Sequence, residues 1–151
     1  VDLRNIVTDV LGLLDRELMS ASTKVTTDFS IDDPVVLADR VEMQQVIANL
    51  ITNGLHAMGS VPAEQRDLSI SLTAAEMDMV RLQVRDRGTG IAPENLAKLF
   101  SPFFTTKNEG MGIGLAICKT IVEAHGGSLT ARNHDDGGAI FEIVLPLSAE
   151  E

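Results

Sequence analysis

Polar side chains recur along one side of an otherwise apolar stretch. Gln45, Asn49 and Asn53 are spaced four residues apart, and His56 follows seven residues after Asn49. At about 100° per residue, these positions share one stripe of a helix. Leaving a buried carboxamide unpaired costs roughly 1–3 kcal/mol. The stripe is therefore either a solvated edge of a partly exposed helix or a row of oxygen ligands and amide donors for Mg²⁺ and phosphate.

An aspartate stands at the end of a half-buried strand. Asp86 continues the alternation of Val80, Leu82 and Val84, so the strand directs its side chain to the buried face. Residues 87–90 (RGTG) follow at once, and their glycines permit left-handed turns and close backbone approach. The carboxylate suits an acceptor for a ligand N–H group, such as the adenine amino group. The alternative is an Asp-Gly turn in which the side chain caps its own loop.

Glycines alternate with other residues just before a helical pattern. Gly110, Gly112 and Gly114 would let successive backbone N–H groups converge on an anion, and the helix dipole would add to the attraction. Lys107 could supply a point charge. Upstream, residues 100–107 (FSPFFTTK) contain three of the five phenylalanines, which suits an aromatic anchor beside a lid over a ligand. A small satellite hydrophobic cluster is the alternative for Phe100 and Phe103.

Hydrophobic periodicity predicts the elements that must position these residues. We expect helices at 5–18, 39–58, 93–99 and 112–125, and strands at 68–73, 80–85, 128–133 and 139–145. Asp39 and Glu42 read as a capping box for the second helix. A strand pair is expected within 24–37, broken at 32–34 (DDP). Together these elements predict a single α+β domain over 1–151, a two-layer sandwich with a mixed, mainly antiparallel sheet covered by helices on one face.

Composition narrows the partners. The formal net charge of −10 argues against nucleic acid and against a membrane surface. The lone Cys118 cannot form an internal disulfide, which favours a reducing, cytoplasmic setting. No apolar run approaches the roughly 18 residues that span a bilayer, and no signal-peptide pattern is present.

Four motifs in this order closely resemble the ATP-binding catalytic domain of bacterial sensor histidine kinases, within the gyrase–MutL–chaperone ATPase superfamily. Residues 45–53 (QVIANLITN) look like the N box and 86–90 (DRGTG) like the first glycine box. Residues 100–107 look like the F box and 110–115 (GMGIGL) like the second glycine box. The resemblance covers essentially the whole chain and implies the Bergerat-type ATP-binding fold.

The resemblance also implies the site, with Mg-ATP as its ligand. Asn53 would ligate Mg²⁺ and Asn49 would support the metal and phosphates, so that Asn49, Asn53 and Lys107 are the catalytic set. Asp86 would accept from the adenine amino group. The implied nucleotide-binding residues are Asn49, Asn53, His56, Asp86, Gly88, Gly90, Ile91, Phe104, Thr105, Thr106, Lys107, Gly110, Gly112, Ile113, Gly114 and Leu115. In one departure, Ala57 stands where many relatives have an adenine-stacking tyrosine.

The residue at position 49 separates two reaction classes. Hydrolytic relatives carry a glutamate there as general base, and an asparagine cannot take a proton. Transfer of the γ-phosphate to another protein is therefore favoured over hydrolysis. None of the three histidines stands in the family's acceptor signature, so the acceptor histidine is expected on a separate dimerisation domain that precedes Val1 in the parent protein. A response regulator, a separate protein, is expected as an indirect partner. The piece alone is expected to be a monomer. A protein-serine kinase, an ATPase of the same fold and a non-catalytic docking module are the alternatives.

Overall fold

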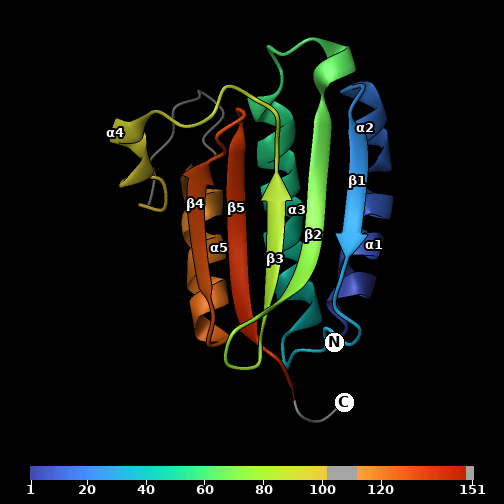
Figure 1. Cartoon of the computed structure of the whole chain (residues 1–151), viewed down its shortest axis with the longest axis vertical. Coiled ribbons are helices and arrows are strands. Elements are labelled where there is room, and N and C mark those ends of the chain that lie inside the picture. Colours follow the sequence, from blue (N-terminus) through green and yellow to red (C-terminus); the bar gives the residue numbers. More distant parts are fainter. Residues whose placement is uncertain (102–111, 149–151) are drawn as a thin grey trace.

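A five-stranded sheet forms one layer of the molecule (Figure 1). The computed structural model describes residues 1–101 and 112–148 of the chain. The strand order is β1-β2-β3-β5-β4, with β1 parallel to β2 and the other neighbours antiparallel. The strands are β1 (Lys24–Phe29), β2 (Asp67–Ala75), β3 (Met79–Arg85), β4 (Ser128–Asn133) and β5 (Ala139–Pro146). The mixed, mainly antiparallel sheet is confirmed.

Helices lie behind one face of this sheet in Figure 1. They are α1 (Leu3–Leu13), α2 (Asp15–Ser20), α3 (Arg40–Ala57) and α5 (Gly112–Ala124), with the short α4 (Pro93–Leu96) at one end and a 3-10 turn, η1 (Ala63–Gln65). Ile47 and Leu50 of α3 pack with Leu72 and Leu82 of the sheet in one buried core. Burial of this apolar surface is the main force joining the layers. Within the described residues, no helix is long and apolar enough to cross a membrane.

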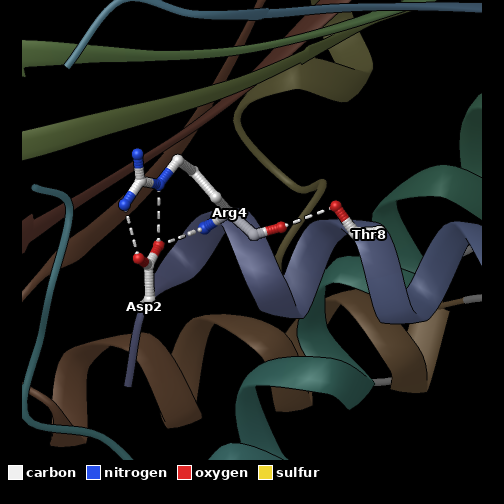
Figure 2. A network of polar contacts seen from close by, with 3 residues as sticks. All are labelled: Asp2, Arg4 and Thr8. Atoms are coloured by element: carbon white, nitrogen blue, oxygen red, sulfur yellow. Dashed lines mark hydrogen bonds and ion pairs between the residues drawn. The ribbon is translucent and has the colours of Figure 1, made fainter. Parts of the chain in front are cut away.

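The first helix begins with a side-chain cap (Figure 2). The Asp2 carboxylate accepts from the backbone N–H of Arg4 at 2.9 Å and from Nε and Nη2 of the same residue at 3.1 and 2.7 Å. The Thr8 hydroxyl donates to the Arg4 carbonyl. The predicted 5–18 helix is divided into α1 and α2, because Leu14 leaves the helical region at φ −98° and ψ 9°.

The second strand expected within 24–37 does not form, so this prediction was wrong. Residues after β1 contribute one isolated bridge, Val35 to Asp2, and β1 pairs in parallel with β2 instead of forming a hairpin. Pro34 has no N–H to donate to a ladder, and its carbonyl accepts from Leu3 at the start of α1. The segment therefore crosses the beginning of α1.

The start of α3 is fastened to the end of α5. Asp39 accepts from the Glu42 N–H at 2.9 Å, which is one half of the predicted capping box; the reciprocal bond from the Asp39 N–H to the Glu42 side chain does not form. The Asp39 N–H donates to Nε2 of His125 at 3.2 Å. Nδ1 of that ring lies 2.8 Å from the Ile121 carbonyl and therefore carries the proton. His125 thus has a structural role, joining the ends of two helices that flank the candidate site.

Candidate functional site

The polar stripe of α3 divides at the last turn. Asn49 and Asn53 are half-buried, and Asn53 lines a cavity at the end of the helix. His56 is exposed and lines a different cavity, between α2 and α3. Rotation along the helix does not explain this division, because His56 lies about 20° from Asn49 around the helix axis and Asn53 about 40°. The neighbouring elements separate the residues instead, since α2 borders His56 whereas the loop after β3 borders Asn53.

Asp86 is buried against α3 at 2 % exposure. Its Oδ1 accepts from the Gly88 N–H at 2.8 Å and from the Ala139 N–H at 3.3 Å. A Cβ on Gly54, the residue after Asn53, would lie 3.5 Å from the Asp86 Cβ. The inward direction and the capping of its own loop are both confirmed for Asp86, whereas its role as an acceptor for a ligand stays a prediction.

Two glycines let the loop after β3 approach its neighbours. A Cβ on Gly88 would lie 2.3 Å from the Ala57 carbonyl oxygen, so a side chain there requires the loop to shift. Gly90 has φ +82°, a conformation that favours glycine. The predicted left-handed conformation is therefore found at Gly90, and Gly88 makes a close backbone approach to the end of α3.

Asn133 and Gly138, which the sequence did not single out, hold this loop from the β4–β5 turn. Asn133 accepts from the Ile91 N–H and donates to the Ile91 carbonyl, both at 2.7 Å. Gly138 has φ +81°, and a Cβ there would lie 2.0 Å from the Asp86 carbonyl oxygen. Two strands were expected at 128–133 and 139–145, but no local signal showed which distant loop the turn between them would contact.

A cavity of about 290 Å³ lies between the last turn of α3, this loop and α4. Its wall combines two carboxamides and a hydroxyl with small and apolar side chains, as in small-molecule pockets generally. It is lined by Asn53, Ala57, Thr89, Gly90, Ile91, Ala92, Asn95, Leu99 and Phe141. The cavity therefore joins the predicted residues Asn53, Gly90 and Ile91 from two motifs that are distant in sequence.

The beginning of α5 faces Asn49. A Cβ on Gly114 would lie 3.6 Å from Asn49 Nδ2, and that amide donates to Cys118 Sγ at 3.5 Å. Burial raises the pKa of the Cys118 thiol, while the hydrogen bond from Asn49 acts in the opposite direction. Leu115 is buried in the core. The second glycine box and the N box therefore meet at Asn49.

Of the F box (residues 100–107), the structure describes only residues 100 and 101, and Phe100 contacts another aromatic ring. Phe100 packs edge to face on Phe141, with ring centroids 6.3 Å apart, and Lys119 Nζ lies 5.4 Å from the centre of its ring. Since Phe141 also lines the cavity, Phe100 is anchored to the cavity wall. The predicted residues Phe104, Thr105, Thr106, Lys107 and Gly110 lie outside the described residues. Gly112 and Ile113 are in the first turn of α5.

Known proteins are similar to this chain both in sequence and in fold. Residues 38–149 match the family described as histidine kinase-, DNA gyrase B-, and HSP90-like ATPase. The chain is 41 % identical over 140 residues to the sensor protein FixL of Bradyrhizobium diazoefficiens, covering 93 % of this chain and 27 % of FixL. It is 39 % identical to the C4-dicarboxylate transport sensor protein DctS of Rhodobacter capsulatus, covering 99 % of this chain and 23 % of DctS. The chain thus spans about a quarter of the length of these relatives.

Solved structures agree. The nucleotide-free catalytic domain of histidine kinase ThkA superposes with a TM-score of 0.85 at 32 % identity, covering 97 % of this chain and 93 % of that chain. ThkA in complex with the response regulator protein TrrA gives a TM-score of 0.81 at 30 % identity, covering 100 % of this chain and 42 % of that chain. The chain therefore belongs to the histidine kinase-, DNA gyrase B- and HSP90-like ATPase family, with the fold of a histidine kinase catalytic domain.

Proposed function

We propose that this chain binds Mg-ATP and presents its γ-phosphate to a histidine on a separate dimerisation and phosphoacceptor domain of a sensor kinase. The observation that carries the proposal is the cavity that joins Asn53 of α3 to Gly90 and Ile91 of the loop after β3. Buried Asp86 precedes this loop, and Asn49 faces the beginning of α5. Family membership supports ATP as the ligand, and Mg²⁺ is the finer part of the proposal.

The base of the nucleotide fits the apolar end of the cavity. Ala57, Leu99 and Phe141 supply contact surface, and the Asp86 carboxylate is held in position by two backbone N–H groups. A fixed, buried acceptor of this kind suits an exocyclic amino group, because its position is set before the ligand binds. We therefore assign adenine recognition to Asp86 and to the loop from Gly88 to Ile91.

The phosphates belong at the other end, where α3 meets α5. Asn49 and Asn53 offer amide oxygens, which are suitable ligands for Mg²⁺. The N-terminus of α5 adds backbone N–H groups and a favourable dipole for anions. Bound Mg²⁺ would neutralise phosphate charge. Lys107, with residues 104–106 and Gly110, is proposed to complete this end from outside the described residues.

The residue at position 49 favours transfer of the γ-phosphate over hydrolysis of ATP, because Asn49 can position its partners but is not a general base. An asparagine orients its partners but accepts no proton from water. Of the histidines in the chain, His125 is engaged by Ile121 and Asp39, and Nδ1 of His134 accepts from the Asp136 N–H. We therefore place the acceptor histidine on another part of the parent protein, which is expected to act on a response regulator in the cytoplasm.

Nucleotide binding is tested first, by calorimetry with ATP in the presence and absence of Mg²⁺. Asn53→Ala should abolish the Mg²⁺-dependent part of the affinity, and Asp86→Asn should reduce discrimination between ATP and GTP. Lys24→Gln, on the far strand β1, is the control and should bind as the unmodified chain does. Unchanged affinity in both site variants would refute the pocket.

The reaction is tested by supplying the dimerisation and phosphoacceptor domain of a sensor kinase relative with labelled ATP. Transfer to histidine predicts an acid-labile, base-stable product that disappears with Asn53→Ala. An acid-stable product would support a protein-serine kinase, and release of free phosphate without a labelled protein would support an ATPase. Binding without either outcome would favour a docking module.

A further inference from the structure

A third cavity, of about 470 Å³ and lined mainly by polar residues, lies on the face of the sheet away from the helical layer. This face of the sheet is turned to the viewer in Figure 1. Strand alternation directs Arg85 to this face, opposite to its neighbour Asp86. The register aligns Ser69, Arg85, Ile140 and Arg132 in one row across β2, β3, β5 and β4. All four residues line the cavity, so two arginines flank an apolar residue on its floor.

The Arg85 guanidinium has an unsatisfied edge. Its Nε and Nη2 are buried and have no hydrogen-bond partner among residues 1–101 and 112–148. In Arg4 the same two nitrogens bind both oxygens of the Asp2 carboxylate, as Figure 2 shows. This edge of a guanidinium matches the paired oxygens of a carboxylate or phosphate.

The charge of Arg85 is also poorly compensated. Burial lowers the pKa of Arg85, and the neighbouring Arg87 lowers it further, against weaker attraction from acidic residues. Leaving buried charged donors unpaired is unfavourable by more than the loss of an ordinary hydrogen bond. An incoming anion would remove this penalty.

Other groups in the cavity are compatible with an anionic ligand. Glu142, the carboxylate in the next row, is engaged by Gln83 at 2.7 Å and by Arg132 at 3.2 Å, so it does not compete for Arg85. Ser69 and Ser71 add hydroxyl donors beside Ile140. Asp135 also lines the cavity and repels anions, so directed donors rather than net charge must hold the ligand.

We propose that this cavity binds a small organic anion through a carboxylate or phosphate group paired with Arg85 and Arg132, and that its occupancy strengthens nucleotide binding. The coupling rests on the proposed function and follows from the β4–β5 turn, which borders both sites. Asn133 lines the anion cavity and also holds Ile91 through two hydrogen bonds. His134 lines the cavity as well, and Gly138 in the same turn contacts the Asp86 carbonyl.

Binding is measured on the 151-residue chain without nucleotide, by ¹H–¹⁵N NMR and calorimetry with succinate and with phenyl phosphate. Sodium chloride at matched ionic strength is the reference. Saturable shifts around Arg85 with either probe support the site, and the stronger probe identifies the preferred group. Shifts that sodium chloride reproduces would overturn it.

Arg85→Gln should weaken the anion affinity about tenfold or more, because a charge-assisted bidentate contact is lost. Arg81→Gln is the matched control, since Arg81 lies on the same face and contacts Glu142 at 3.6 Å without lining the cavity. Its anion affinity should stay within about twofold of the unmodified chain. Arg85→Gln should unfold at a temperature no lower than the unmodified chain, because the variant removes a guanidinium whose Nε and Nη2 are buried without a partner. Equal anion affinity in the two variants would contradict the proposal.

The coupling is measured separately, as the ATP affinity with and without saturating probe. We expect a gain of about fivefold, at the lower end of typical coupling between sites, and loss of the gain in Arg85→Gln. Anion binding that leaves ATP affinity unchanged would overturn the coupling. Failure to bind ATP even without the probe would instead overturn the proposed function, so the two failures are distinguishable.

Discussion

Replacing Gly138 by alanine tests whether the β4–β5 turn holds the Asp86 loop in its binding conformation. An ideal Cβ at this position would lie 2.0 Å from the Asp86 carbonyl oxygen and 3.0 Å from the Arg87 Cα, where ordinary contacts begin near 3.4 Å. The carbonyl must therefore retreat by more than an ångström. The Asp86 N–H donates to the Ala139 carbonyl at 3.0 Å and the Ala139 N–H donates to Asp86 Oδ1 at 3.3 Å, so the carboxylate should move with the loop.

The expected magnitude has two parts. An alanine forced to φ +81° costs about 1–2 kcal/mol, and displacing packed backbone adds about 1–3 kcal/mol. Gly137→Ala is the matched control, because Gly137 has φ +103° and no atom within 4 Å of the added Cβ. That variant should lose only the first part, about 1–2 kcal/mol.

Urea unfolding and ATP calorimetry on both variants check this prediction. Gly138→Ala should be less stable than Gly137→Ala by about 1–3 kcal/mol and should bind ATP more weakly. Gly137→Ala should retain ATP affinity under conditions where it is folded. If the two variants were equally stable and bound ATP equally well, the contact between the turn and the Asp86 loop would have no energetic role.

Two further measurements examine the ion pair at the start of α1 and the burial of Cys118 in α5. The Arg4 side chain lowers the pKa of Asp2, so the contribution of this pair is present above the ordinary aspartate pKa and is lost as pH falls through the lowered value. Asp2→Asn keeps a good helix cap, and it should lower the melting temperature by about 1–4 °C at pH 7 and by progressively less toward pH 3; an equal loss at both pH values would exclude the ion pair. Cys118 is fully buried and contacts Asn49, so iodoacetamide should label the native chain far more slowly than the unfolded chain, and Mg-ATP should slow labelling further. Labelling at the unfolded rate, followed by mass spectrometry, would show that this part of the site opens freely.

Local patterns in the sequence were sufficient for most elements. The period of α3, the cap at Asp39 and the alternation that buries Asp86 depend on residues within one or two turns, so they can be predicted without the fold. The same holds for the fold class and for the four motifs in order. The family match and the solved structures confirm the fold class and the family. The ligand roles of individual residues stay predictions.

Tertiary structure decided which of these elements meet. The parallel pairing of β1 with β2 links residues 24–29 to residues 67–72, and no local pattern specifies such a pairing. His56 shared the polar stripe in sequence but lines another cavity, because α2 borders the last turn of α3 on that side.

The sequence by itself determined which residues could serve chemistry: two asparagines one turn apart, an inward aspartate and two glycine loops. Only the tertiary structure showed what holds them and what lies behind them. Asn133 and Gly138 support the Asp86 loop from a distant part of the chain. Asn133, for example, is 42 residues away from Ile91, to which it is hydrogen-bonded. Arg85 has an unpaired edge on the opposite face of the sheet. Both depend on contacts between distant segments, which periodicity and motif spacing do not encode because they describe only neighbours along the chain.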